Sequence, residues 1–133
     1  MRTVSKTVIG VDFGTQSARA VLVNAENGEI IYSCRKEYPY NSTPVPAIDC
    51  AENLPCATDY EMTLYELLRN VIPEEYRKTV AGICVDATSL TMVLLAEDGR
   101  ALSELDGWSE AAHARVKLWK YHRAQEKADE ALN

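Results

Sequence analysis

The sequence has no apolar run long enough to span a membrane, and the residues after Met1 lack the apolar stretch of a secretion signal. It also has no run of Lys or Arg long enough to neutralise several phosphates of a polynucleotide, and its net charge is −6. Clustered basic residues supply most of the affinity of nucleic-acid-binding proteins. We therefore expect a cytoplasmic protein whose partners include neither a membrane nor a nucleic acid.

Cysteine is present but lacks the spacing that would give it a structural role. The four cysteines, at positions 34, 50, 56 and 84, include no C-x-x-C pair and have no nearby histidine. This spacing supports neither a disulfide framework nor a zinc site. In a reducing compartment we expect each cysteine to be a small, buried or half-buried apolar residue, with a reactive thiol as the less favoured alternative.

The first third of the chain has the pattern of a strand meander. An apolar content of 47% in 133 residues is enough for one globular domain with its own core. Asn27-Gly28 is a strong hairpin signal, and four prolines between positions 39 and 55 predict a surface loop. Alternating β-branched and apolar residues predict three strands, at 7–13, 18–24 and 29–36.

The rest of the chain has two helical patterns and one clear strand. Leucines at i, i+3 and i+4 after the capping-box pattern of Thr58 to Glu61 predict a helix at 58–72, stopped by Pro73. A strand is expected at 80–86, followed by an apolar run at 92–96. The Ala-, Lys- and Glu-rich stretch from about 113 to 132 predicts a long helix.

These elements predict a mixed sheet with a helical crossover. We expect the strand at 80–86 to lie parallel to the first strand, with the helix at 58–72 as a right-handed connection between them. Each of these two strands ends in a carboxylate, Asp12 and Asp86, followed by small polar residues. The sequence thus predicts one sheet that carries two polar turns.

The first polar turn, D-F-G-T-Q-S-A-R from Asp12 to Arg19, has the chemistry of a phosphate site. Gly14 lets the backbone approach an anion, and Thr15, Gln16 and Ser17 add hydroxyl and amide donors. Asp12 can hold Mg²⁺ through water, because Mg²⁺ keeps much of its hydration shell. The alternative is an ordinary hairpin turn, in which Asp and Gly are also common.

Three segments carry a resemblance to a known family. Residues 8–19 (VIGVDFGTQSAR) resemble the first phosphate motif of the actin, Hsp70 and sugar-kinase superfamily, in the form found in FGGY carbohydrate kinases. Residues 82–89 (GICVDATS) resemble the strand and turn that touch the sugar in those kinases, and residues 113–122 (HARVKLWKYH) resemble a stretch of ribulokinases. The resemblance covers nearly the whole chain and is weakest at 39–57.

The resemblance implies a fold and a domain plan. The fold would be α/β, of the ribonuclease H-like (actin-like ATPase) type: a mixed sheet with an antiparallel meander and crossover helices, here incomplete. Residues 1–133 would be part of the N-terminal FGGY kinase domain, with the C-terminal ATP-binding domain absent. The exposed domain interface would be apolar enough for self-association.

The resemblance also implies an activity and site residues. A longer parent would transfer phosphate from ATP, with Mg²⁺, to a hydroxyl of a pentulose such as ribulose or a related sugar or polyol. Asp12 would organise the metal and Gly14, Thr15, Gln16 and Ser17 the phosphates, while the sugar would lie by Ala87, Thr88, Ser89, Trp119 and Lys120. The catalytic base is expected beyond residue 133, so the chain alone would be inactive. The alternative is a non-catalytic module that binds sugar or phosphate.

Overall fold

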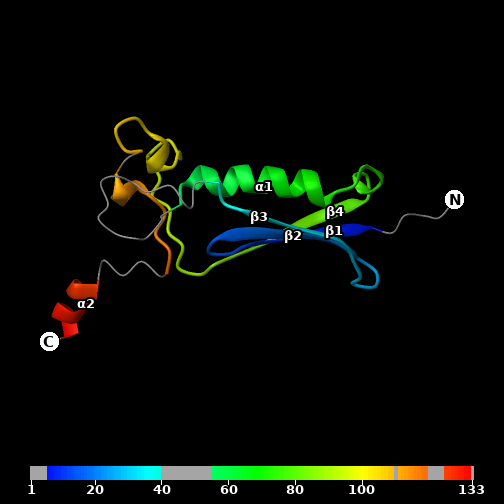
Figure 1. The fold of residues 1–133 in the computed structure, drawn as a ribbon, viewed down its shortest axis with the longest axis horizontal. Helices are drawn as coiled ribbons and strands as arrows, with labels where there is room; N and C mark the ends of the chain where they lie inside the picture. Colours follow the sequence, from blue (N-terminus) through cyan, green and yellow to red (C-terminus); the bar gives the residue numbers. More distant parts are fainter. Residues whose placement is uncertain (1–5, 40–54, 110, 120–124, 133) are drawn as a thin grey trace.

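The computed structural model describes residues 6–39, 55–109, 111–119 and 125–132. In this part of the chain, a small sheet carries one long helix on one face (Figure 1). No helix among these residues has the length and apolar character needed to cross a bilayer. The elements are β1 (Thr7–Phe13), β2 (Ser17–Asn24), β3 (Ile30–Glu37), α1 (Ala57–Val71), β4 (Val80–Ala87) and α2 (Gln125–Leu132), with short 3₁₀ turns at Glu74–Tyr76, Leu102–Glu104 and Ala112–Ala114.

The sheet has four strands in the order β3-β2-β1-β4. β1 pairs antiparallel with β2 and parallel with β4, and β2 pairs antiparallel with β3. The predicted meander and the parallel placement of the strand at 80–86 are therefore confirmed. Asp12 is the register partner of Asp86, so the two polar turns leave the sheet side by side. The handedness of the crossover stays a prediction.

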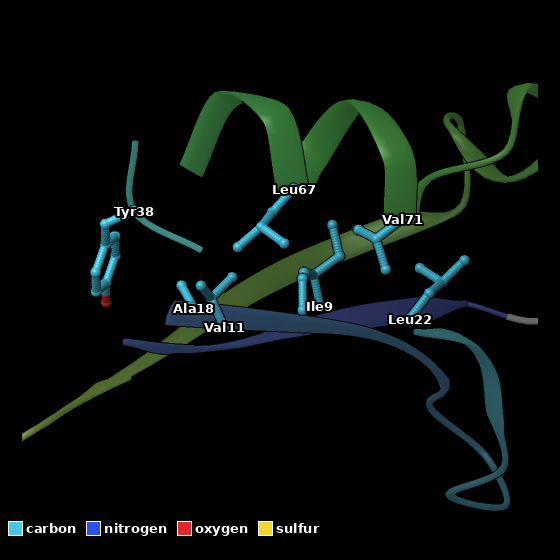
Figure 2. Close-up of a cluster of buried hydrophobic side chains, with 8 residues drawn as sticks. Ile9, Val11, Ala18, Leu22, Tyr38, Leu67 and Val71 are labelled. Atoms are coloured by element: carbon cyan, nitrogen blue, oxygen red, sulfur yellow. The ribbon is translucent and has the colours of Figure 1, made fainter. Parts of the chain in front are cut away.

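α1 buries one face of the sheet, as the alternation in β1 predicts. Ile9 and Val11 are buried, whereas Gly10 and Asp12 point to the opposite face. Figure 2 shows the side chains of Leu67 and Val71 directed from α1 toward the sheet. The cluster comprises Ile9, Val11, Ala18, Ala20, Leu22, Tyr38, Leu67 and Val71. This packing fixes the ends of β1 and β2, between which the first polar turn lies.

The hairpin between β2 and β3 is formed as predicted. Gly28 has a φ of 74°, a left-handed conformation that glycine adopts without steric cost. The backbone N–H of Asn24 donates to the carbonyl oxygen of Glu29 at 2.9 Å and closes the turn. The hairpin therefore sets the register that brings the end of β3 back beside the first polar turn.

α1 begins differently from the prediction. The capping residue is Cys56 rather than Thr58, and the carboxylate of Asp59 accepts the backbone N–H of Cys56 at 2.8 Å. Thr58 lies within the first turn, where its hydroxyl donates to Glu104 at 3.0 Å. The predicted capping box was wrong by two residues. Asp59 takes the place of the predicted Glu61, because its carboxylate accepts the backbone N–H of Cys56 and so caps the helix two residues earlier.

The helix predicted from about 113 to 132 was wrong over its first part. Ala112–Ala114 form a 3₁₀ turn, Lys117 forms an isolated bridge with Met92, and Ala114, Val116 and Leu118 are buried in alternation with more exposed neighbours. Within the described part of the predicted stretch only α2 is α-helical, and residues 120–124 lie outside the described residues. A two-residue period of apolar side chains therefore outweighed the helix propensity of Ala, Lys and Arg.

The apolar run at 92–96 forms isolated bridges, from Met92 to Lys117 and from Leu95 to Ala101. One smaller expectation also needs correction. Cys84 is exposed on β4, whereas Cys34 and Cys56 are half-buried as expected. Cys50 lies outside the described residues.

Candidate functional site

The first polar turn is closed by its own backbone. The N–H of Gly14 donates to the carbonyl oxygen of Ser17 at 3.0 Å. A Cβ at position 14 would stand 3.1 Å from that same oxygen, so any other residue would force the turn to shift. Thr15 and Gln16 form the tip, and Gln16 is exposed. The turn is therefore narrow and rigid at its base, and its polar tip is open to a ligand.

Tyr38 supports this turn from the end of β3. Its hydroxyl donates to the carbonyl oxygen of Gly14 at 2.8 Å, and its backbone N–H donates to that of Gln16 at 3.2 Å. Burial raises the pKa of the Tyr38 hydroxyl, with further contributions from Tyr60 and the carboxylate of Asp12. The hydroxyl therefore keeps its proton at neutral pH and remains a donor to the turn.

The second polar turn is attached directly to the first. Both the backbone N–H and the hydroxyl of Thr88 donate to the carbonyl oxygen of Phe13, at 2.9 and 3.0 Å. The hydroxyl of Thr91 in turn donates to the carbonyl oxygen of Thr88 at 2.8 Å. Leu90 has a φ of 59°, which is uncommon for a residue with a side chain. The two turns thus form one polar edge at the carboxyl ends of β1 and β4.

Asp12 and Asp86 lie together on the face of the sheet opposite α1. They line an open hollow of about 350 Å³ with Arg19, whose Nε is 3.7 Å from an oxygen of Asp12. Among the described residues no group of three or more His, Cys, Asp or Glu side chains could hold a metal ion. Mg²⁺ commonly takes only one or two protein carboxylates and fills its shell with water and phosphate oxygens. The two carboxylates fit that pattern of binding.

A second hollow, of about 330 Å³, lies on the α1 side of the turns. It is mostly apolar, and its lining includes Phe13, Tyr60 and Val93 together with Ala87 and Thr88 of the second polar turn. The rings of Phe13 and Tyr60 pack edge to face with centroids 5.8 Å apart. The Tyr60 hydroxyl is buried and has no hydrogen-bond partner among the described residues. Burial raises its pKa to about 12, so it stays protonated.

Trp119 reaches the first turn from the far end of the chain. Its indole Nε1 donates to the hydroxyl of Thr15 at 3.4 Å, and its side chain is 58% exposed. The structure therefore brings Trp119 and both polar turns to the same end of the sheet. Lys120 lies outside the described residues.

Sequence reasoning missed three residues that support the site. Tyr38 could have been found by extending the β2–β3 register one residue beyond its last pair, Ser17 with Glu37. The same register places Arg35 close enough for its Nε to donate to the hydroxyl of Ser17 at 2.9 Å. Arg115, which contacts Cys56, had no signal in the sequence because the two residues are 59 positions apart.

Comparisons with known proteins give the chain its relatives. No family model matches it. It is 39% identical over 126 residues to ribulokinase 1 of Staphylococcus saprophyticus, and this match covers 90% of the chain and 23% of that protein. It is 34% identical to a ribulokinase of Mycolicibacterium smegmatis (93% and 24% covered) and 33% identical to one of Halalkalibacterium halodurans (97% and 24% covered). The chain spans about a quarter of the length of these relatives.

Solved structures show the same fold. A gluconate kinase and a xylulose kinase of Lactobacillus acidophilus each match with a TM-score of 0.65 and 20% identity, over 96% of this chain and 22% of theirs. The mixed sheet with its antiparallel meander is therefore the actin-like ATPase type of fold found in these kinases, as expected from the resemblance. Over almost its whole length, the chain is a relative of ribulokinases with the fold of FGGY-type sugar kinases.

Proposed function

We propose that the chain is the phosphate- and sugar-binding part of a longer ATP-dependent sugar kinase. The substrate class is a pentulose such as ribulose, or a related sugar or polyol, and such an enzyme is expected in the cytoplasm. One observation carries the proposal: Thr88 joins the second polar turn to Phe13 at the base of the first. The identity of 39% between this chain and a ribulokinase supports the same assignment.

The first turn is the proposed site for the phosphates of ATP. Gly14 keeps its base narrow, and Thr15, Gln16 and Ser17 offer side-chain and backbone donors to phosphate oxygens. Asp12, with Asp86 beside it, would hold Mg²⁺ largely through water. When bound, the metal would neutralise charge on the phosphoryl group being transferred. Arg19 now balances the charge of Asp12 from 3.7 Å.

The second turn and Trp119 are the proposed site for the sugar. Ala87, Thr88 and Ser89 follow β4, so they stand beside the phosphate turn, where an attacking hydroxyl would have to lie. The exposed indole of Trp119 offers a flat surface and a donor near Thr15. Lys120, which lies outside the described residues, is proposed to contribute a cation to sugar binding. Holding sugar and phosphate in one geometry is what phosphoryl transfer needs most from a protein.

The remaining machinery is proposed to lie outside this chain. Transfer to an alcohol also needs a base for the hydroxyl proton and a pocket for adenosine, and the chain matches only 23% of ribulokinase 1. We assign the base and the adenosine pocket to the part of the relatives that the chain does not match. The isolated chain would then bind ligands without turning them over.

The alternative is a module that binds sugar or phosphate without catalysis. Isothermal titration separates the two proposals, because a kinase part should bind nucleotide only with Mg²⁺, and its affinity for sugar should change when nucleotide is present. A non-catalytic sugar-binding module should bind sugar with the same affinity whether or not nucleotide or Mg²⁺ is present. Titration of ribulose, ATP and Mg²⁺ in all pairwise orders is the measurement.

Asp12→Asn in the longer parent tests the kinase proposal most sharply. Loss of the carboxylate should lower kcat by about a hundredfold or more, because the metal acts mainly on the transition state. The KM for sugar should stay within about twofold. Asp98→Asn is the matched control, since Asp98 is an exposed carboxylate paired with Arg100 at 2.7 Å, outside both turns. Near-normal turnover of Asp12→Asn would remove Asp12 from the mechanism.

We also propose that the isolated chain self-associates through β4. The N–H of Thr88 bonds to β1, so by the alternation of a parallel ladder the backbone groups of Ile83 and Val85 point away from the sheet. Among the described residues no strand pairs with this edge. A second copy pairing along β4 would satisfy these groups and cover the exposed Ile83 and Val85.

A further inference from the structure

The segment that ends at Trp119 is held mainly by its first residues. Val116 donates its backbone N–H to the carbonyl oxygen of Pro55 at 3.1 Å, and Lys117 exchanges two backbone hydrogen bonds with Met92, both at 3.0 Å. Trp119 itself is 58% exposed, and its indole donates a hydrogen bond to Thr15 at 3.4 Å. The place of the indole therefore depends on how the preceding backbone is anchored rather than on packing around the ring.

Arg115 supplies a side-chain anchor to this segment. Its Nη1 donates to the sulfur of Cys56, the residue that caps α1. Its Nε is buried and has no hydrogen-bond partner among the described residues. A guanidinium that is partly desolvated in this way is costly to move, because alternative positions must also satisfy its charge. Arg115 thus ties the segment to the N-terminus of α1.

The surroundings of Cys56 suit a cationic partner. Asp59, which is 0% exposed, accepts the backbone N–H of Cys56 at 2.8 Å. The positive charge of Arg115 lowers the pKa of the Cys56 thiol, whereas burial, which is the larger effect, and the charges of Asp59 and Glu104 raise it. The thiol therefore stays protonated, and the guanidinium of Arg115 lies close enough to it to act on its pKa.

We propose that Arg115 is a positioning residue for Trp119, acting through Cys56 at the start of α1. Arg115 lies four positions before Trp119, so at most roughly 13 Å of chain separates them. Together with the backbone hydrogen bonds of Val116 and Lys117, this contact limits where the indole stands relative to Thr15. The proposal concerns the place of Trp119, and it bears on sugar binding only through the proposed function above. The contact thereby links the start of α1 to the sugar side of the site.

The test follows Trp119 directly in the 133-residue chain. The chain contains two tryptophans, so Trp108→Phe leaves Trp119 as the only fluorescent indole. In that background, Arg115→Met should at least halve the slowly decaying fraction of the time-resolved anisotropy of Trp119, because an unanchored exposed side chain reorients in nanoseconds or less. Arg77→Met is the matched control, since Arg77 is exposed and forms an ion pair with Glu74, at 3.1 Å. It should leave the decay unchanged.

A second pair of variants approaches the contact from the other side. Cys56→Ala removes the acceptor and should mobilise Trp119 as Arg115→Met does, whereas Cys56→Ser keeps an acceptor and should preserve most of the slow decay. Circular dichroism checks that each variant folds. If Arg115→Met does not fold, Cys56→Ala tests whether the contact positions Trp119. An unchanged decay in whichever of Arg115→Met and Cys56→Ala folds would overturn the proposal.

A kinetic measurement in the longer parent separates this inference from the proposed function. Arg115→Met should raise the KM for sugar about tenfold while changing kcat and the KM for ATP by less than about twofold, as expected for lost positioning of a substrate contact. Arg77→Met should change none of them. A mobile Trp119 with an unchanged KM for sugar supports the positioning role and rejects Trp119 as a sugar contact. An immobile Trp119 rejects the positioning role whatever the kinetics show.

Discussion

β1 and β4 are neighbouring strands with similar sequences and very different surroundings. Ile9 and Val11 of β1 are the register partners of Ile83 and Val85 of β4, on the same face of the sheet. Ile9 is 1% exposed beneath α1, whereas Ile83 is 54% exposed beyond the reach of the helix. The same side chains therefore form the core in one strand and an apolar surface in the next. The pattern that the two sequences share predicts that each segment is a strand and which side chains share a face. It does not predict whether another element covers that face.

The two edges of the sheet differ in the same way. β3 ends in Arg35, Lys36 and Glu37, and Lys36 pairs with Glu66 of α1 at 2.6 Å. Charges of this kind keep an edge strand from pairing with another chain. β4 carries no charge before Asp86. The site lies at the end of this unprotected edge, as expected if further parts of the parent pack there.

The same substitution, isoleucine to alanine, should destabilise the chain more at the covered position in β1 than at the exposed position in β4. Ile9→Ala should lower the free energy of unfolding by about 2–5 kcal/mol, because it leaves a cavity under α1. Ile83→Ala should lower it by less than about 1 kcal/mol, because much of the side chain is already in water. Urea unfolding at a protein concentration low enough to keep the chain monomeric measures both. Equal losses would mean that β4 is covered in solution.

A charge on β4 should break self-association. Val85→Lys would place a lysine in the proposed pairing surface of both copies and should weaken the association by about a hundredfold or more. Tyr32→Lys is the matched control, since Tyr32 is an exposed residue of the opposite edge strand, β3. Sedimentation velocity over a concentration series gives the constants. Self-association that survives Val85→Lys, or that Tyr32→Lys abolishes, would place the contact elsewhere.

A smaller effect is expected at the supporting tyrosine of the phosphate turn. Tyr38→Phe removes the donor to Gly14 and should lower the free energy of unfolding by about 1 kcal/mol. Tyr32→Phe, at an exposed position of β3, should change it by less than about 0.5 kcal/mol. Thermal and urea unfolding of the two variants make the comparison. A neutral Tyr38→Phe would show that the turn holds its shape without this bond.

The pH dependence of the Tyr38 effect has a definite sign. Burial raises the pKa of this hydroxyl in the folded chain. Its contribution to stability should therefore be complete below the unfolded-state pKa of about 10 and be lost as pH rises through the folded-state pKa. The stability gap between the wild-type chain and Tyr38→Phe should narrow only in alkaline solution. A gap that narrows between pH 5 and 8 would contradict this origin.

Much of the fold could be predicted because its signals are local. The alternation in β1, the Asn27-Gly28 turn and the leucine spacing of α1 each specify an element within a few residues. The start of α1 and the segment before Trp119 were predicted wrongly, since Asp59 and the buried Val116 are selected by packing against distant residues. In the site, the residues of the two turns could be identified from the sequence. The contact of Arg115 with Cys56 could not, because it joins residues that are 59 positions apart in the sequence.

The most direct measurement is a kinase assay of the 133-residue chain alone, with ATP, Mg²⁺ and ribulose or related pentuloses and pentitols. The account predicts binding without turnover, because the base and the adenosine pocket are assigned to the rest of a longer enzyme. Sugar-dependent ADP release should then equal the no-enzyme control. Release above that control, from material free of contaminating kinase and abolished by Asp12→Asn, would show that one part of the fold is sufficient and contradict the account.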